Sequence, residues 1–189
     1  RCTNACNPST TTFAKLPVIQ MPLTEDGRHL RVDDSEYASL IEALARKVRR
    51  SAWEFDIVLC LARGGLRPGD VLSRIFDKPL AVLSTSSYRA SAGTVQGRLE
   101  IAPQISCASS NIAGRVLLVD DMVDSGETLR AVVQWLAVQH PEIRELRSAV
   151  IWQKAISTFV PNYVVEFLPT SPWIHQPFEK YDGMKLEDL

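Results

Sequence analysis

The sequence predicts an α/β protein with a mainly parallel central sheet flanked by helices. Short apolar runs alternate with segments of helical periodicity, as in sheets whose parallel strands are joined by helices. Glycine-rich or acidic turns directly follow several of these runs. A length of 189 residues allows one sizeable core, so a single domain is the simplest expectation.

Helical periodicity marks the first element. Asp33 and Glu36 form a capping-box pattern ahead of regularly spaced apolar residues, which predicts a helix over residues 34–50. The same periodicity predicts helices over 66–76 and 127–139. Continuous apolar runs predict five strands, at residues 57–62, 80–84, 116–119, 149–152 and 163–168.

Composition limits the classes of partner. The formal net charge of −1 argues against a broad surface for nucleic acid or anionic membrane, and no apolar run approaches a membrane span. No secretory leader is evident, so we expect a cytoplasmic protein. The four cysteines lack metal-ligand spacing. Residues 1–24 are rich in Thr, Pro and Asn and are expected to form a flexible tail, with residues 25–189 forming the domain.

Polar segments follow three of the predicted strands. They are residues 63–65, residues 120–128 and Lys154. Ligands of open α/β sheets bind beyond the carboxyl ends of the strands, so these segments can converge on one cleft.

Residues 120–128 carry the densest chemistry. Asp120 and Asp121 end an apolar strand, and carboxylates there can accept hydrogen bonds from sugar hydroxyls or hold Mg²⁺. Consecutive strand residues point to opposite faces, so separate roles are expected rather than a proton-sharing dyad, unless the strand has already turned. Residues 124–128 place two hydroxyls and a glycine where backbone amides open a helix, which favours phosphate binding. Alternatively, Asp124 or Ser125 caps the helix and the aspartates only solvate a strand end.

Residues 116–129, VLLVDDMVDSGETL, resemble the phosphoribosyl-diphosphate (PRPP) binding motif of type I phosphoribosyltransferases. The resemblance implies their α/β fold, with a small hood at the C-terminal segment, mainly from about residues 153–189. It implies that Asp120 and Asp121 address the ribose hydroxyls and Mg²⁺, with Asp121 as the metal ligand. The residues that wrap the 5′-phosphate would be Ser125, Gly126, Glu127 and Thr128.

Two further loops resemble parts of bacterial xanthine-guanine phosphoribosyltransferases. Residues 61–69 resemble the diphosphate-binding loop, in which Arg63, Gly64 and Gly65 would contact the leaving group and a cis peptide would fall at Ala62–Arg63. Ser87 and Tyr88 resemble the Ser-Tyr pair of a mobile lid over PRPP. Without the resemblance, each segment is also consistent with an ordinary turn or surface loop.

The resemblance also implies how a base is read. Asp124 matches the residue that pairs with purine N7 and can take its proton, and Lys154 matches the lysine that donates to O6. Trp173 would stack on the base and Ile174 would supply backbone contacts. The segment departs from the family at His175, which replaces a glutamate, and at Glu179, which replaces an aspartate, so the preferred 6-oxopurine stays open. Otherwise Lys154 is an exposed charge and Trp173 a packing anchor.

The expected activity is therefore Mg²⁺-dependent transfer of phosphoribosyl from PRPP to guanine, xanthine or hypoxanthine. Asp124 and Arg63 are the expected catalytic residues, and Asp124 is also expected to lie against PRPP. The resemblance implies a homodimer or homotetramer with small-molecule substrates. Two alternatives are a PRPP- or nucleotide-sensing regulator without turnover and a phosphoribosyltransferase for another nitrogen heterocycle.

Overall fold

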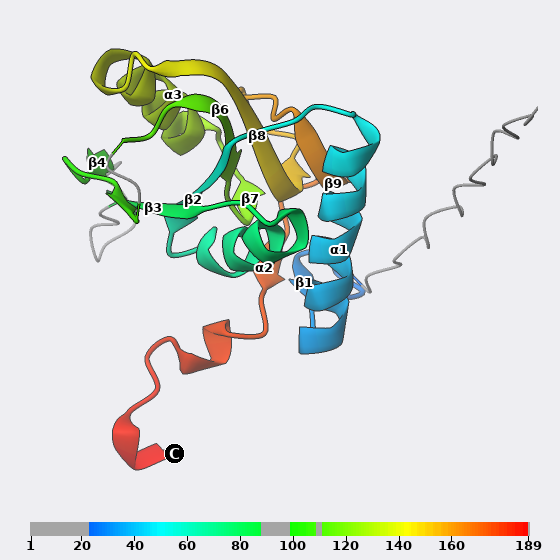
Figure 1. Cartoon of the computed structure of the whole chain (residues 1–189). Coiled ribbons are helices and arrows are strands. Elements are labelled where there is room, and N and C mark those ends of the chain that lie inside the picture. The colour runs from blue at the N-terminus through cyan, green and yellow to red at the C-terminus, as the bar shows by residue number, and fades with distance from the viewer. Residues whose placement is uncertain (1–22, 88–98, 109–110, 189) are drawn as a thin grey trace, which may run out of the picture.

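A mainly parallel sheet forms the centre of the molecule (Figure 1). The computed structural model describes residues 23–87, 99–108 and 111–188. Within them, eight strands form one sheet in the order β4-β3-β2-β6-β8-β7, with β5 on β3 and β9 on β8. The pairs made by β2, β6, β7, β8 and β9 are all parallel, whereas β4 and β5 run antiparallel to β3. The predicted fold class is confirmed.

All five predicted strands are present. The long strands are β2 (Ile57–Ala62), β3 (Leu80–Ser87), β6 (Gly114–Val119), β8 (Ile143–Lys154) and β9 (Tyr163–Leu168). Three of them extend beyond their apolar runs because backbone pairing continues where the side chains leave the core. Five short strands were not predicted, since two or three residues show no periodicity. They are β1 (His29–Arg31), β4 (Leu99–Ile101), β5 (Ser106–Cys107), β7 (Met122–Val123) and β10 (Trp173–His175).

The three predicted helices have the predicted bounds. They are α1 (Asp34–Arg50), α2 (Leu66–Phe76) and α3 (Glu127–Gln139). The capping box is present, because Asp33 Oδ1 accepts from the Glu36 amide at 2.8 Å and Glu36 Oε2 accepts from the Asp33 amide at 2.9 Å. Two short 3₁₀ helices, Glu179–Tyr181 and Leu186–Asp188, lie in the C-terminal segment.

The helices cover opposite faces of the sheet (Figure 1). Along β2, Val58 and Cys60 pack with the buried side chains of α1 and α2, whereas Leu59 and Leu61 pack with those of α3. This alternation follows from the two-residue period of a strand. Because both faces are covered, a ligand can reach the central strands only at their ends.

A separate two-stranded ribbon, β1 paired with β10, lies beside the main sheet. Its buried pair is Leu30 and Ile174, which are 1% and 4% exposed and pack in the core beneath α1. The hood was expected mainly from about residues 153–189, and the ribbon adds β1 to that C-terminal part. Leu23 bridges to Leu30, although sequence analysis placed it in the tail. The rest of the predicted tail, residues 1–22, lies outside the described residues.

Candidate active site

Asp120 and Asp121 stand at the carboxyl end of β6, which is flanked by β2 and β8. The strand has already ended at Val119, so the expected alternation between sheet faces does not apply to them. Asp120 Oδ1 accepts from the Asp121 amide at 3.0 Å, and Asp121 Oδ1 accepts from the Met122 amide at 2.7 Å. The other Asp121 oxygen, Oδ2, accepts from the side-chain amide of Gln176.

Burial raises the pKa of both carboxyl groups above the ordinary aspartate value. For Asp120, the neighbouring charge of Asp121 raises the pKa further. For Asp121, the hydrogen bonds from Gln176 and Met122 oppose the effect of burial. Two carboxylates crowded in this way favour a cation or hydroxyl donors beside them.

The glycine loop after β2 packs directly on these acids. A Cβ atom at Gly64 would lie 2.5 Å from Asp121 Oδ1, and one at Gly65 would lie 2.4 Å from the Val119 carbonyl oxygen. Neither position has room for a side chain. The peptide bond between Ala62 and Arg63 is cis, as the resemblance implies. The predicted convergence of this loop with the end of β6 is therefore confirmed.

Arg63 itself points outward. Its side chain is 87% exposed, and its Nη2 lies 3.8 Å from Asp182 Oδ1, an ion pair screened by solvent. An exposed guanidinium at the mouth of the glycine loop is free to turn toward an anion. Its expected contact with the diphosphate stays a prediction.

Asp124 and Lys154 meet across the site. Lys154 Nζ donates to Asp124 Oδ2 at 3.3 Å, and the lysine is buried although its strand ends there. Asp124 Oδ1 is itself buried with no hydrogen-bond partner among the described residues. The N-cap of α3 is Gly126, so Asp124 is not the helix cap, and the alternative of an exposed Lys154 is wrong. The pair presents one acceptor and one donor side by side.

The loop leading into α3 has the features expected of a phosphate site. Gly126, the N-cap residue of α3, has φ +88° and has no side chain with which to cap the helix. Ser125 Oγ accepts from the Glu127 amide at 3.3 Å, which stabilises the turn. The positive end of the α3 dipole faces the same edge of the sheet as the aspartates.

The residues expected to contact the base, Trp173 and Ile174, lie on the β1–β10 ribbon, where Trp173 is more exposed than Lys154. Trp173 is 50% exposed, and its Nε1 donates to Glu179 Oε2 at 3.3 Å. The Ile174 side chain is in the core, which leaves only its backbone for a ligand. His175 Nε2 lies 2.9 Å from His29 Nδ1, so one imidazole donates and the other accepts. His29 was not among the predicted site residues.

Sequence reasoning also missed Gln176. Its side chain is 7% exposed, and it ties the ribbon's C-terminal end to Asp121. A glutamine inside an otherwise predicted base-binding segment was the available signal, but its partner is 55 residues away along the chain. The lid residue Tyr88 and the side chain of Ser87 lie outside the described residues.

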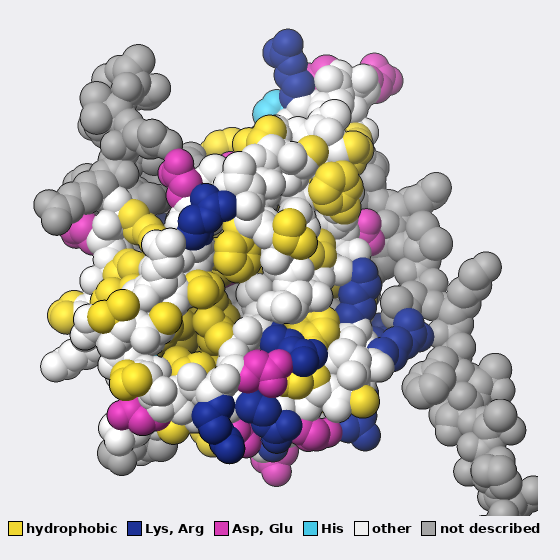
Figure 2. Space-filling model, turned by 90° about the horizontal axis from the view of Figure 1, so that it is seen from above, with side chains coloured by type: hydrophobic (Ala, Val, Ile, Leu, Met, Phe, Trp, Pro, Cys, Tyr) yellow, Lys and Arg dark blue, Asp and Glu magenta, His cyan; other side chains and the backbone are white. Residues whose placement is uncertain are grey.

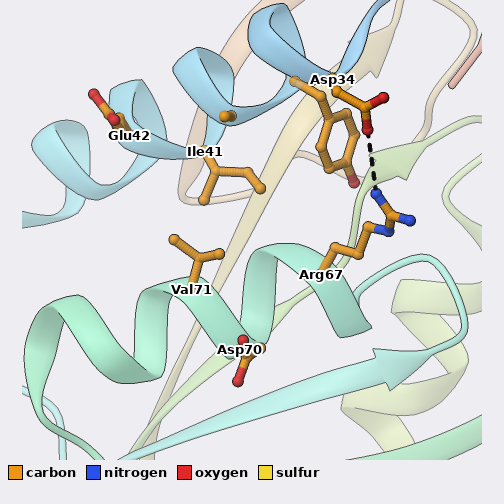
Figure 3. Close-up of a pocket in the computed structure, with 8 residues that line it drawn as sticks. Asp34, Ile41, Glu42, Arg67, Asp70 and Val71 are labelled. Carbon is orange, nitrogen blue, oxygen red and sulfur yellow. Dashed lines mark ion pairs between the residues drawn. The ribbon is translucent and has the colours of Figure 1, made fainter. Parts of the chain in front are cut away.

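A hollow lies between α1 and α2, and Arg67, from the segment 61–69, lines it (Figure 3). It has a volume of about 370 Å³, and Ile41 and Val71 face each other across it. Asp34 and Arg67 form an ion pair of 3.8 Å at one end. The Arg67 guanidinium also stacks 4.5 Å from the ring centroid of Phe178. These contacts join the two helices to the C-terminal segment.

The donor set at the end of β6 fits a magnesium ion. Mg²⁺ is usually held by one or two carboxylates together with substrate phosphates and waters. The described residues contain no cluster of three or more His, Cys, Asp or Glu side chains arranged for a metal. A Mg²⁺ ion held by Asp120 and Asp121 would therefore need further oxygen ligands, from waters or from a phosphorylated substrate.

These features are typical of proteins with a site for a phosphorylated ligand at the carboxyl edge of a parallel sheet. Acidic groups, a glycine loop and a helix N-terminus meet there beside a paired carboxylate and lysine. The phosphoribosyl transferase domain family matches residues 32–182 of the chain. The chain belongs to that family.

Relatives agree with this assignment. The chain is 30% identical over 105 residues to a xanthine-guanine phosphoribosyltransferase of Ruegeria sp. strain TM1040, a match covering 48% of this chain and 59% of the relative. A purine phosphoribosyltransferase from Pyrococcus horikoshii superposes with a TM-score of 0.65 at 29% identity, covering 79% of this chain and 93% of that one. The xanthine-guanine-hypoxanthine enzyme of Helicobacter pylori gives 0.62 at 25% identity, covering 78% and 91%. The fold is that of the type I phosphoribosyltransferases.

The surface seen in Figure 2 carries mixed charge. Lys and Arg side chains are interleaved with Asp and Glu along one edge of this face. In the part of the chain that the structure describes, no helix is both long and apolar enough to cross a bilayer.

Proposed function

We propose that the protein transfers the phosphoribosyl group from PRPP to a 6-oxopurine, giving the nucleoside 5′-monophosphate and diphosphate. The observation that carries this proposal is the contact of 3.3 Å between Asp124 and the buried Lys154. A 6-oxopurine has an acceptor at O6 beside N7, and it matches a lysine that only donates next to a carboxylate. The exocyclic amino group of adenine would face a donor.

The chain's own residues would act mainly by positioning and charge. Asp124 would orient the purine through N7 and accept its proton, while Lys154 holds O6. The half-exposed ring of Trp173 offers a face on which the base stacks. The amides of residues 125–128 would hold the 5′-phosphate, and Arg63 with the glycine loop would stabilise the departing diphosphate.

Asp120 and Asp121 would bind the ribose hydroxyls and, together with PRPP oxygens, Mg²⁺. When bound, the ion would neutralise charge on the diphosphate. Burial raises the pKa of both carboxyl groups, which supports this role, because a cation or hydroxyl donor beside them would offset the cost of their buried charge. Gln176 would keep Asp121 in place through its hydrogen bond to Oδ2.

The test is to incubate purified protein with PRPP, MgCl₂ and each of guanine, xanthine and hypoxanthine, and to separate the products by chromatography. Adenine and orotate serve as control bases, and an Asp124→Asn variant as the control protein. We expect a nucleotide from at least one 6-oxopurine and little from the control bases. Failure of all three 6-oxopurines to react would contradict the proposal, and turnover of orotate instead would favour another heterocycle.

A second candidate is a PRPP-sensing regulator without turnover. The pairing of Asp124 with Lys154 argues against it, because binding PRPP alone requires neither residue to face a base. The mixed charge in Figure 2 gives no support for nucleic-acid binding on that face. Salt-sensitive binding of DNA or RNA without catalysis would reverse this ranking.

The domain extent, oligomeric state and location of the protein are also proposals. We propose that residues 25–189 act as one domain in a cytoplasmic homodimer or homotetramer. Light scattering of the purified protein would distinguish these assemblies from a monomer.

A further inference from the structure

The last residue of β8 and the segment that follows it contact three consecutive residues of the loop before α3. Lys154 pairs with Asp124, the Thr158 amide donates to the Ser125 carbonyl at 2.9 Å, and Phe159 packs on Gly126. A Cβ atom at Gly126 would lie only 2.5 Å from Phe159 Cβ. The segment is therefore seated directly on the proposed phosphate loop.

Thr158 makes a second bond to the same carbonyl. Its hydroxyl lies 3.1 Å from the Ser125 oxygen, and since a carbonyl only accepts, the hydroxyl must donate. The hydroxyl oxygen then accepts from Arg130 Nη2 at 2.9 Å, and the Thr158 carbonyl accepts from the same nitrogen at 2.6 Å. Arg130 lies in the first turn of α3, where its amide donates to the Gly126 carbonyl at 3.0 Å.

These bonds form a closed circuit from Ser125 through Thr158 and Arg130 back to Gly126. In a trans peptide the N–H points opposite to the C=O. Anchoring the Ser125 carbonyl on Thr158 therefore turns the Gly126 N–H to the other side of the loop. Among the described residues no acceptor is found for that N–H. It is left to face an anion at the start of α3.

We infer that Thr158 and Arg130 are positioning residues for PRPP. They hold the Ser125–Gly126 peptide in the orientation that binds the 5′-phosphate, and neither residue itself touches the substrate. This inference rests on the proposed function. Lys154, proposed to hold O6, and Thr158, which holds the Ser125 carbonyl, therefore belong to one short segment, residues 154–158.

The test compares Thr158→Val and Arg130→Met with wild type in steady-state kinetics. Valine keeps the shape and the backbone bond of Thr158 but removes its hydroxyl, and methionine removes the guanidinium. We expect the KM for PRPP to rise about threefold to tenfold in each variant, with kcat and the KM for the purine changed by less than about twofold. Thr158→Ser, which keeps the hydroxyl, should retain the wild-type KM.

Two controls separate positioning from general damage. Arg144→Met removes an arginine whose guanidinium is 77% exposed and lies 3.8 Å from Asp56, and it should leave all constants unchanged. The double variant Thr158→Val/Arg130→Met should raise the KM for PRPP less than the product of the single effects, because both act through one carbonyl. Full multiplication of the effects, or a Thr158→Ser variant as impaired as Thr158→Val, would overturn the inference.

Calorimetric titration of PRPP with MgCl₂ into the wild type and the two variants measures PRPP binding separately from turnover, so the inference and the proposed function can fail independently. If wild type binds PRPP and the two variants bind it equally well, the inference fails while the proposed function stands. If wild type binds PRPP but turns over no base, weaker binding by the variants still supports the inference. If wild type does not bind PRPP, both fail.

Discussion

Two regions of the site differ in their burial: the acidic end, formed by Asp120, Asp121, Asp124 and Lys154, and the β1–β10 ribbon. At the acidic end, Asp121 is 9% exposed and Lys154 is 7% exposed; Asp121 lies just beyond the end of β6, and Lys154 is the last residue of β8. On the ribbon, Trp173 is 50% exposed, and each strand is three residues long. The acidic end is held in place by buried strands of the main sheet, whereas the ribbon is a separate pair of strands that packs on the core through Leu30 and Ile174.

This difference in burial predicts different roles for the two regions in substrate binding. Gly64 and Asp121, both proposed to bind PRPP, are crowded against each other, so few substitutions fit there. The ribbon residues proposed to distinguish one 6-oxopurine from another, Trp173 and His175, lie on strands outside the main sheet. We therefore expect large effects on turnover at the acidic end and smaller effects, confined to the base, on the ribbon.

The largest effect is expected at Asp124. Asp124→Ala should lower kcat/KM for the purine by roughly 100-fold or more, because it removes the proposed proton acceptor and orienting group. It also leaves the buried Lys154 without its carboxylate. Asp124→Asn keeps an acceptor for the lysine but cannot take a proton, so it should lose turnover with less loss of stability. Turnover by Asp124→Asn at the wild-type rate would contradict the role of Asp124.

The next largest effect concerns Asp120, where activity and stability should change in opposite directions. Asp120→Asn should raise the KM for PRPP about tenfold or more, because it removes a charged acceptor for the ribose hydroxyls. Without ligands, the same change should raise the free energy of unfolding at neutral pH by on the order of 1 kcal/mol. Burial raises the pKa of Asp120 in the folded state, so its ionised form costs stability.

The pH dependence checks this explanation. Above the folded-state pKa the wild type carries the full cost of the charge, and the cost fades as the pH falls through that pKa toward the unfolded value of about 4. The difference in unfolding free energy between Asp120→Asn and wild type should therefore shrink on acidification. Urea unfolding at several pH values measures it, and a difference that grows toward acid pH would contradict the assignment.

On the ribbon, Trp173→Ala should raise the KM for the purine about tenfold, since a base stacked on an aromatic ring gains about 1–3 kcal/mol. The KM for PRPP should stay within about twofold of wild type. Phe167→Ala is the matched control, because Phe167 is an exposed aromatic residue on β9 that the site does not use. An unchanged purine KM in Trp173→Ala would remove the stacking role.

The smallest effect is expected from His175→Glu. The change breaks the contact of 2.9 Å with His29 and replaces an imidazole by an acceptor of hydrogen bonds. We expect kcat/KM for guanine relative to xanthine to rise about threefold, because the carboxylate can accept from the 2-amino group. Competition assays with mixed bases measure the ratio, with His140→Gln, beside Trp135 at the end of α3, as control. An unchanged ratio would place His175 away from the base.

Much of the fold could be predicted because its main elements are long enough to show periodicity. The three helices match the predicted bounds, and β9 does so as well. The short strands could not be predicted, since pairing between β1 and β10 depends on residues more than 140 positions apart. Similarly, the sequence left open whether Asp120 and Asp121 continue the strand, where their side chains would diverge, or lie beyond its turn, and only the structure, in which β6 ends at Val119, decided between the two.

The sequence by itself determined the chemistry at each loop: acids after one strand, glycines after another, a lysine after a third. Residue type and local spacing are sufficient for that, because strand ends and helix starts are local features. Only the tertiary structure decided which groups meet. Lys154 reaches Asp124, Thr158 braces Ser125, and Gln176 holds Asp121, because the order of strands in the sheet brings distant segments to one edge.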